Sequence, residues 1–224
     1  MKLLKGIILL GLPIATVLFC LMNPGREGRL IFSIFILFVI FERVWEGLYT
    51  SKDKKIDKIE GDWTLPVSII SYILLIVFCL LEFYLVKRNI NLYVTWLAFF
   101  AYSFALFLRL WAVKSLGNQW SVHIIGINKI EADRRLIKSG PYKYIIHPVY
   151  LGIILEQVSI PLVANLYYVF LIFACLTIPF QFLKARLEEK EMESYLGEAY
   201  VKYKTLTPRF NFILGLLKAK VNTI

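Results

Sequence analysis

Residues 139–150 read S-G-P-Y-K-Y-I-I-H-P-V-Y, and they open the last pair of hydrophobic helices that the sequence predicts. Gly140 precedes Pro141, which forces an extended or turned backbone, and the missing Cβ of the glycine lets a ligand come close. Pro148 is expected to begin a helix with His147 near its N-cap, because proline is favoured at the first helical position. A helix start offers free N–H groups and a partial positive charge, so it suits an anionic group such as a carboxylate.

Three tyrosines lie within this stretch, Tyr142, Tyr144 and Tyr150. Their π faces are suited to holding a cation. The same pattern is also typical of a proline-containing loop with tyrosines at a membrane interface. Local chemistry leaves both interpretations open.

Outside this stretch the chain is strongly apolar. Of its 224 residues 58% are hydrophobic, and the mean hydropathy is +0.65. Several windows reach the roughly 20 apolar residues that cross a hydrocarbon core about 30 Å thick. The composition therefore predicts an all-α, multi-pass integral membrane protein. The first hydrophobic stretch has no convincing cleavage site, so it is expected to be retained.

The hydrophobic windows predict about six transmembrane helices. A hairpin is expected in the last window, because Pro161 and Asn165 interrupt a run too long for one span. After Lys184 an amphipathic helix is expected on the membrane surface, interrupted near Gly197. The chain thus divides into an N-terminal four-span region, 1–113, and a second region, 114–224, with loops and short strands before the hairpin. The expected spans are 6–22, 30–49, 66–86, 92–113 and the two arms of 149–182.

A few polar residues interrupt these spans. Glu42 and Glu46 are one helical step apart, and they could line an internal polar surface or lie at the membrane interface; the interface is favoured. Arg109 lies near the end of its span and is expected to extend to the lipid headgroups. Glu156 and Gln157 are expected to face the protein interior.

The net charge of +10 has an uneven distribution. If both termini are cytoplasmic, the inside segments carry 20 basic residues and the outside loops carry 4. This bias supports an even number of spans with both termini inside. It also accounts for the net charge by topology and attraction to membrane lipids rather than by nucleic-acid binding. Residues 139–150 and the segment after Lys184 then share the cytoplasmic face.

Cysteine and histidine give no metal-site pattern. Cys20, Cys79 and Cys175 lie far apart within apolar runs and are expected to be buried apolar residues. The only histidines are His123 and His147, without an HExxH or CxxC motif, so no metal is expected. His123 is interpreted as a loop residue at the interface.

A second informative stretch is R-L-E-E at 186–189, followed by L-G-E-A-Y at 196–200 and by Tyr203. Glu188 and Glu189 point about 100° apart on a helix, so they need not do the same job. One could accept hydrogen bonds from ammonium or ribose hydroxyl groups, and the other could hold a neighbouring cation. The alternative is an ordinary solvated surface helix.

Taken together, these motifs resemble the isoprenylcysteine carboxyl methyltransferase family. The order is G-P-Y at 140–142, H-P-V-Y-L-G at 147–152, a hydrophobic hairpin, R-x-E-E at 186–189, L-G-x-x-Y-x-x-Y at 196–203 and P-R at 208–209. Phospholipid N-methyltransferases share this arrangement. The similar region covers about 116–210.

The resemblance implies a membrane methyltransferase that uses S-adenosylmethionine on the cytoplasmic side. It also implies that Arg186 and Glu189 belong to the catalytic site, with Arg186 as a support or substrate contact. Ile146 departs from the family, which usually has arginine there; any anion-binding role is then absent or supplied by Lys143, Arg186 or Arg209. The implied donor contacts are Gly140, Pro141, Tyr142, His147, Pro148, Tyr150, Glu188 and Glu189.

The acceptor is not fixed by these motifs. The carboxylate of an isoprenylated cysteine, or of a similar lipid-like acceptor, is already ionised and needs no general base. A phospholipid amine would need a proton acceptor such as Glu188 or Glu189. Two other hypotheses are a sterol-reductase-like membrane oxidoreductase that uses NADPH and a non-catalytic membrane protein. No Rossmann glycine fingerprint follows a strand, so the common soluble methyltransferase architecture does not apply.

Overall fold

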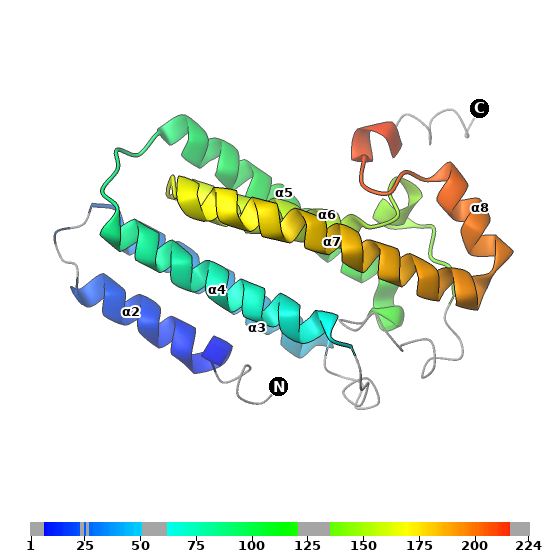
Figure 1. The fold of residues 1–224 in the computed structure, drawn as a ribbon, viewed down its shortest axis with the longest axis horizontal. Helices are drawn as coiled ribbons and strands as arrows, with labels where there is room; N and C mark the ends of the chain where they lie inside the picture. The colour runs from blue at the N-terminus through cyan, green and yellow to red at the C-terminus, as the bar shows by residue number, and fades with distance from the viewer. Residues whose placement is uncertain (1–6, 23–24, 26, 51–61, 121–134, 216–224) are drawn as a thin grey trace.

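The computed structural model describes residues 7–22, 25, 27–50, 62–120 and 135–215, and within these ranges it has helices and turns but no strand (Figure 1). The predicted all-α class is confirmed for these residues. The short strands expected before the hairpin do not occur in the described parts, and residues 121–134 lie outside them. The α-helices are α2 (Leu12–Met22), α3 (Arg29–Thr50), α4 (Thr64–Leu85), α5 (Leu92–Leu116), α6 (Pro148–Val163), α7 (Tyr167–Leu196) and α8 (Glu198–Leu206). The shorter helical segments are the π-helix η1 (Ile7–Gly11) and the 3-10 helices η3 (Gly117–Gln119) and η5 (Gly140–Lys143).

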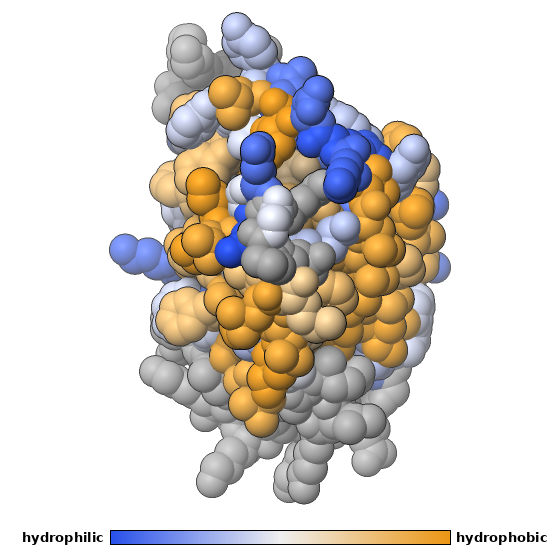
Figure 2. Space-filling model, turned by 90° about the vertical axis from the view of Figure 1, so that its left-hand side faces the viewer, coloured by the Kyte–Doolittle hydropathy of each residue, from blue (hydrophilic) through white to orange (hydrophobic). Residues whose placement is uncertain are grey.

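Among the described helices, α4, α5 and α7 are long and apolar enough to cross a membrane. Their outer faces expose large hydrophobic side chains, and hydrophobic residues cover much of the described surface on the side that Figure 2 presents. Helix α6 is apolar but shorter, and α3 carries Glu42, Arg43 and Glu46 within its 22 residues. The chain is therefore a helical membrane protein by length and composition, and the number of six spans stays a prediction.

The expected hairpin forms between α6 and α7, and polar groups fix its turn. Asn165 adopts a positive φ of 58°, a conformation that asparagine tolerates better than most residues. Its buried side chain donates to Thr95 Oγ1 (2.9 Å) and accepts from the backbone N–H of Asn91 (3.0 Å). Glu82 accepts from the N–H of Val169 (2.7 Å), so a carboxylate meets the free N–H groups at the start of α7.

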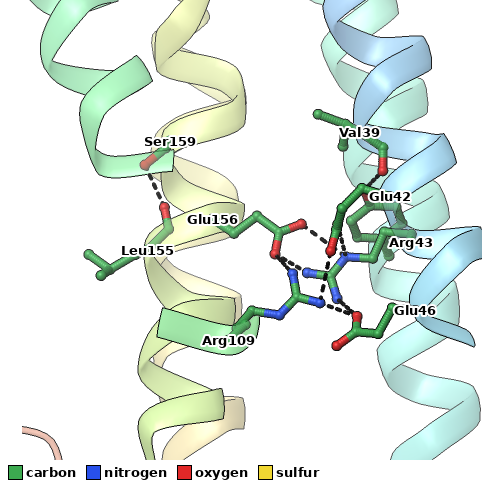
Figure 3. Close-up of polar contacts among 9 residues, drawn as sticks. Val39, Glu42, Arg43, Glu46, Arg109, Leu155, Glu156 and Ser159 are labelled. Atoms are coloured by element: carbon green, nitrogen blue, oxygen red, sulfur yellow. Dashed lines mark hydrogen bonds and ion pairs between the residues drawn. The ribbon is translucent and has the colours of Figure 1, made fainter. Parts of the chain in front are cut away.

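Five charged residues meet in the interior between α3, α5 and α6 (Figure 3). Arg109 is only 2% exposed and bonds to Glu156 and Glu46. Arg43 donates to Glu156 Oε1 (2.9 Å) and to Glu46 Oε2 (3.0 Å). We call Glu42, Arg43, Glu46, Arg109 and Glu156 the Arg109 cluster.

The Arg109 cluster corrects two expectations. Glu42 and Glu46 line the protein interior rather than a membrane interface, and Arg109 does not extend to the headgroups, because both carboxylates pair with Arg109 inside the protein. The expectation that Glu156 and Gln157 face the interior is confirmed, since they are 1% and 5% exposed. Buried charges need such pairing because water is excluded from them.

Gly152 allows α5 and α6 to approach closely beside this cluster. A Cβ at Gly152 would collide with Arg109 Cγ and lie 3.1 Å from the carbonyl oxygen of Ala105. Small residues at helix contacts serve the same purpose in other membrane bundles. The glycine that follows the H-P-V-Y-L motif therefore makes room for the side chain that pairs with Glu156.

The Arg109 cluster gives a stability prediction. Glu156→Gln removes the carboxylate that Arg43 and Arg109 share and leaves them only Glu42 and Glu46. Removing one partner of a buried ion pair costs about 3–5 kcal/mol, and the remaining carboxylates place the expected loss at about 3 kcal/mol. The free energy of unfolding, measured by denaturant titration in detergent micelles, is expected to fall by this amount. The matched control is Glu27→Gln, which changes an exposed glutamate outside the long helices. Equal stability of the two variants would contradict the structural role given to Glu156.

Candidate functional site

The structure brings the two informative sequence stretches together at His147. This residue is 5% exposed and lies at the N-cap of α6, which begins at Pro148 as expected. Its Nε2 lies 3.0 Å from Glu189 Oε1, and its Nδ1 lies 3.6 Å from Glu188 Oε2. The two adjacent glutamates of α7 therefore approach opposite nitrogens of one imidazole ring.

Glu189 is also held by two cations from the chain beyond α7. Arg209 donates to both of its oxygens, at 2.6 and 2.8 Å, in the bidentate geometry that suits a guanidinium and a carboxylate. Lys204 of α8 lies 2.8 Å from Glu189 Oε2. We call His147, Glu188, Glu189, Lys204 and Arg209 the His147 cluster. With three partners Glu189 has little capacity left for a ligand, whereas Glu188 keeps 29% of its side chain exposed.

Backbone hydrogen bonds join the segment after α8 to the chain before α6. The N–H of Ile146 donates to the carbonyl of Pro208 (3.0 Å), and the N–H of His147 donates to the carbonyl of Arg209 (3.2 Å). Because Pro148 has no N–H and that of His147 is engaged, an anion at this helix start would meet fewer free N–H groups than the sequence suggested. The P-R motif at 208–209 thus builds the site with its backbone as well as with a side chain.

Aromatic rings surround the imidazole. His147 stacks on Tyr150 with ring centroids 5.3 Å apart, and Phe210 lies 5.7 Å away. Trp120 and Tyr142 pack against the same hydrophobic group. The indole Nε1 of Trp120 is buried and has no hydrogen-bond partner among the described residues. A buried donor of this kind calls for a polar partner, which a ligand can supply.

The G-P-Y turn is anchored to α5 and α8. Gly140 has a φ of +61°, and a Cβ there would collide with the hydroxyl of Ser115, so glycine is required both by conformation and by space. The hydroxyl of Tyr203 donates to the carbonyl of Tyr142 (2.7 Å). Pro141 is buried at this contact. These contacts hold the turn beside the aromatic group that surrounds His147.

The remaining sequence candidates lie differently. Arg186 is exposed on α7 and the structure does not bring it to the His147 cluster; its proposed role stays a prediction. Lys143 is also exposed, so of the three suggested replacements for the missing arginine only Arg209 reaches the cluster. Ile146 instead packs with Tyr200 and Tyr203 in a buried hydrophobic group.

Sequence reasoning missed several residues that surround the site. Lys204 had no recognisable signal, because it lies in an ordinary charged segment. Trp120 and Phe210 are aromatic residues at the edges of the similar region, and nothing in their spacing indicates burial. Lys184 had one available signal: it ends the apolar run of α7 and precedes Glu188 by four residues, which places both on one helix face.

The charges of the cluster favour a protonated imidazole. Burial disfavours the charged ring, but contacts with Glu188 and Glu189 outweigh it and raise the pKa of His147 above its ordinary value. Hydrogen bonds to Glu189 likewise raise the pKa values of Lys204 and Arg209, so both remain cationic.

This gives a pH prediction. Because the pKa is higher in the folded state, protonated His147 contributes stability that is fully present below about pH 6.5 and is lost as pH rises through the raised value. The difference in unfolding temperature between the natural protein and His147→Gln is therefore expected to be larger at about pH 6 than at about pH 9. His123→Gln, which changes the other histidine, is the control. A difference that grows with pH would contradict this assignment.

Comparisons with known proteins agree with the sequence motifs. A relative from Bacillus subtilis (strain 168), described as Uncharacterized protein YpbQ, is 29% identical over 170 residues, covering 73% of this chain and 98% of the relative. No solved structure matches the chain. The model of the isoprenylcysteine carboxyl methyltransferase (ICMT) family matches residues 96–194, which contain α6, most of α7 and His147, Glu188 and Glu189. The resemblance is thereby confirmed over residues 96–194, which are similar to the isoprenylcysteine-type membrane methyltransferases.

Proposed function

We propose that this protein transfers a methyl group from S-adenosylmethionine to the carboxylate of an isoprenylated cysteine or a similar lipid-like acceptor. The observation that carries the proposal is the meeting of His147 with Glu188 and Glu189, from two segments that the family match includes, beside strongly apolar helices. The charge distribution of the sequence supports a cytoplasmic location for this site and for both termini.

The described side chains fit the chemical groups of such a donor. A sulfonium is a cation, and the ring of Tyr150 offers it a π face while the partly exposed Glu188 offers a carboxylate. The unpartnered indole N–H of Trp120 offers a donor for a heteroatom or hydroxyl of the adenosine moiety. Gly140, Pro141 and Tyr142, which form the turn η5, and Pro148, which begins α6, complete the proposed donor contacts.

The bound donor would supply an activated methyl group, so that one acceptor oxygen forms a bond to the methyl carbon while the sulfur–carbon bond breaks and its electrons stay on sulfur. This displacement yields a methyl ester and a neutral thioether without any proton transfer. The protein has to orient the two reactants and exclude water. Glu189 serves this purpose by fixing His147, and Glu188 by contacting the donor.

The engagement of Glu189 favours a carboxylate acceptor over an amine. A phospholipid amine must lose a proton, so it needs a base within reach. Glu189 is occupied by His147, Lys204 and Arg209, and three cationic or donor partners make it a poor base. A carboxylate acceptor makes no such demand on the site.

Donor binding is the first test of the function. S-adenosylhomocysteine should bind the purified protein, as measured by calorimetry, and His147→Ala and Glu188→Ala should each weaken binding about tenfold or more, since a hydrogen bond to a charged group contributes about 1.5–3 kcal/mol. Lys190→Ala, an exposed lysine on the same helix, should bind as the natural protein does. Binding of NADPH in place of the homocysteine compound would instead indicate the reductase hypothesis.

The chemistry of the product is the second test. Methyl-labelled donor should label N-acetyl-S-farnesylcysteine, and the label should be released by base, because an ester hydrolyses under conditions in which an N-methyl amine is stable. Phosphatidylethanolamine vesicles are the parallel acceptor. Base-stable label in the phospholipid would assign the protein to amine methylation and overturn the carboxylate proposal.

A further inference from the structure

Lys184 is a buried cation with an unusual set of neighbours. It is 5% exposed on α7 and lies one helical turn before Glu188. Its Nζ donates to the hydroxyl of Ser68 (3.2 Å) and lies 5.5 Å from the centroid of the Tyr150 ring. Among the described residues, no carboxylate lies within 4.0 Å of this ammonium group.

The other buried cations that the structure describes are matched to carboxylates. Arg43 and Arg109 pair with the glutamates of the Arg109 cluster. An ammonium group has three donors, and a single neutral hydroxyl cannot replace the hydration that Lys184 loses. A charge without a close anionic partner in the interior is unfavourable. The nearby carboxylates of Asp62 and Glu188 act on Lys184 only from beyond 4.0 Å, so the ammonium group keeps room for a closer anionic partner.

Lys184 lies between the apolar part of α7 and the part of α7 that carries Glu188 and Glu189. Residues 167–183 of α7 contain no charged side chain, so Lys184 is the first charge that follows the apolar segment. Tyr150, whose ring faces Lys184, also stacks on His147. Leu183, which precedes Lys184, and Val67, which precedes Ser68, are 43% and 41% exposed, on outer faces that suit lipid. An amphipathic molecule with an apolar chain in the membrane can thus bring its polar end to Lys184 and to the donor contacts together.

We propose that Lys184 binds a substrate carboxylate at the methyl-transfer site, and that this carboxylate is the one that ends a lipid-like acceptor. The inference deepens the proposed function and depends on it for the identity of the acceptor. The other cations considered for the site are less suited: Arg209 and Lys204 are engaged with Glu189, and Arg186 and Lys143 are exposed. A carboxylate next to the ammonium would accept a hydrogen bond between two charged groups, whereas the hydroxyl of Ser68 accepts only as a neutral group.

The methyl donor also carries a carboxylate, so the same chemistry has two sources. The position of Lys184 between the apolar segment of α7 and Glu188 favours the acceptor. A carboxylate of the donor bound there would make Lys184 part of the donor site instead. The affinities for the two compounds distinguish these sources.

The experiment compares the natural protein with Lys184→Met, Lys184→Arg and the exposed control Lys190→Met. Equilibrium binding of N-acetyl-S-farnesylcysteine and of its carboxamide is measured in detergent without a donor, and S-adenosylhomocysteine binding is measured separately. The natural protein is expected to prefer the carboxylate about tenfold or more, which corresponds to about 1.4 kcal/mol. Lys184→Met should lose this preference, Lys184→Arg should retain most of it, and donor affinity should change less than about twofold. Retained donor affinity also shows that the methionine variant is folded.

The other outcomes of these binding measurements would contradict the role proposed for Lys184. A loss of affinity for S-adenosylhomocysteine with unchanged acceptor preference assigns Lys184 to the carboxylate of the donor. A carboxylate preference that survives in Lys184→Met, or that is absent from the natural protein while donor affinity is unaffected, overturns the inference. The binding measurements need no catalysis, so a protein that binds the carboxylate through Lys184 but transfers no methyl group would overturn the proposed function alone.

Discussion

The ion pair between Arg109 and Glu156 is the interaction on which the rest of the structure depends, because it fixes α6 against α5. Helix α6 begins directly after His147, so its position decides where the imidazole lies. Gly152 makes this approach possible, and Arg43 extends the pairing to α3. Charges buried away from water thus specify how the helices meet, where apolar packing alone would accept several arrangements.

The Arg109 cluster crosses the boundary that the sequence predicted between the two regions of the chain. A boundary near residue 113 separates the first four expected spans from the second region, but Arg43 and Arg109 both pair with Glu156, which lies beyond it. The family match also begins within α5, at residue 96. Helix α5 therefore packs as part of the site-bearing half of the protein, and α3 is bound to that half by charge.

The sequence predicted what depends on local pattern. Apolar windows predicted the helices, Asn165 the hairpin turn and Gly197 the break before α8. It could not place Arg109, because a long side chain near a helix end can reach either the headgroups or the interior, and the carboxylate that decides between them is 47 residues away. At the site, the order of motifs predicted that His147 meets Glu188 and Glu189, whereas the roles of Trp120 and Lys184 depend on burial that spacing does not encode.

The backbone pairing of Pro208 and Arg209 with Ile146 and His147 has a consequence for biosynthesis. A ribosome makes the chain from its N-terminus, and domains generally fold as their segments emerge. Helices α5, α6 and α7 can enter the bilayer while translation continues, but Glu189 receives its bidentate partner only after residue 209 has left the exit tunnel. The nascent protein is thus inserted before the His147 cluster is assembled, and the cluster is completed only once residue 209 has emerged.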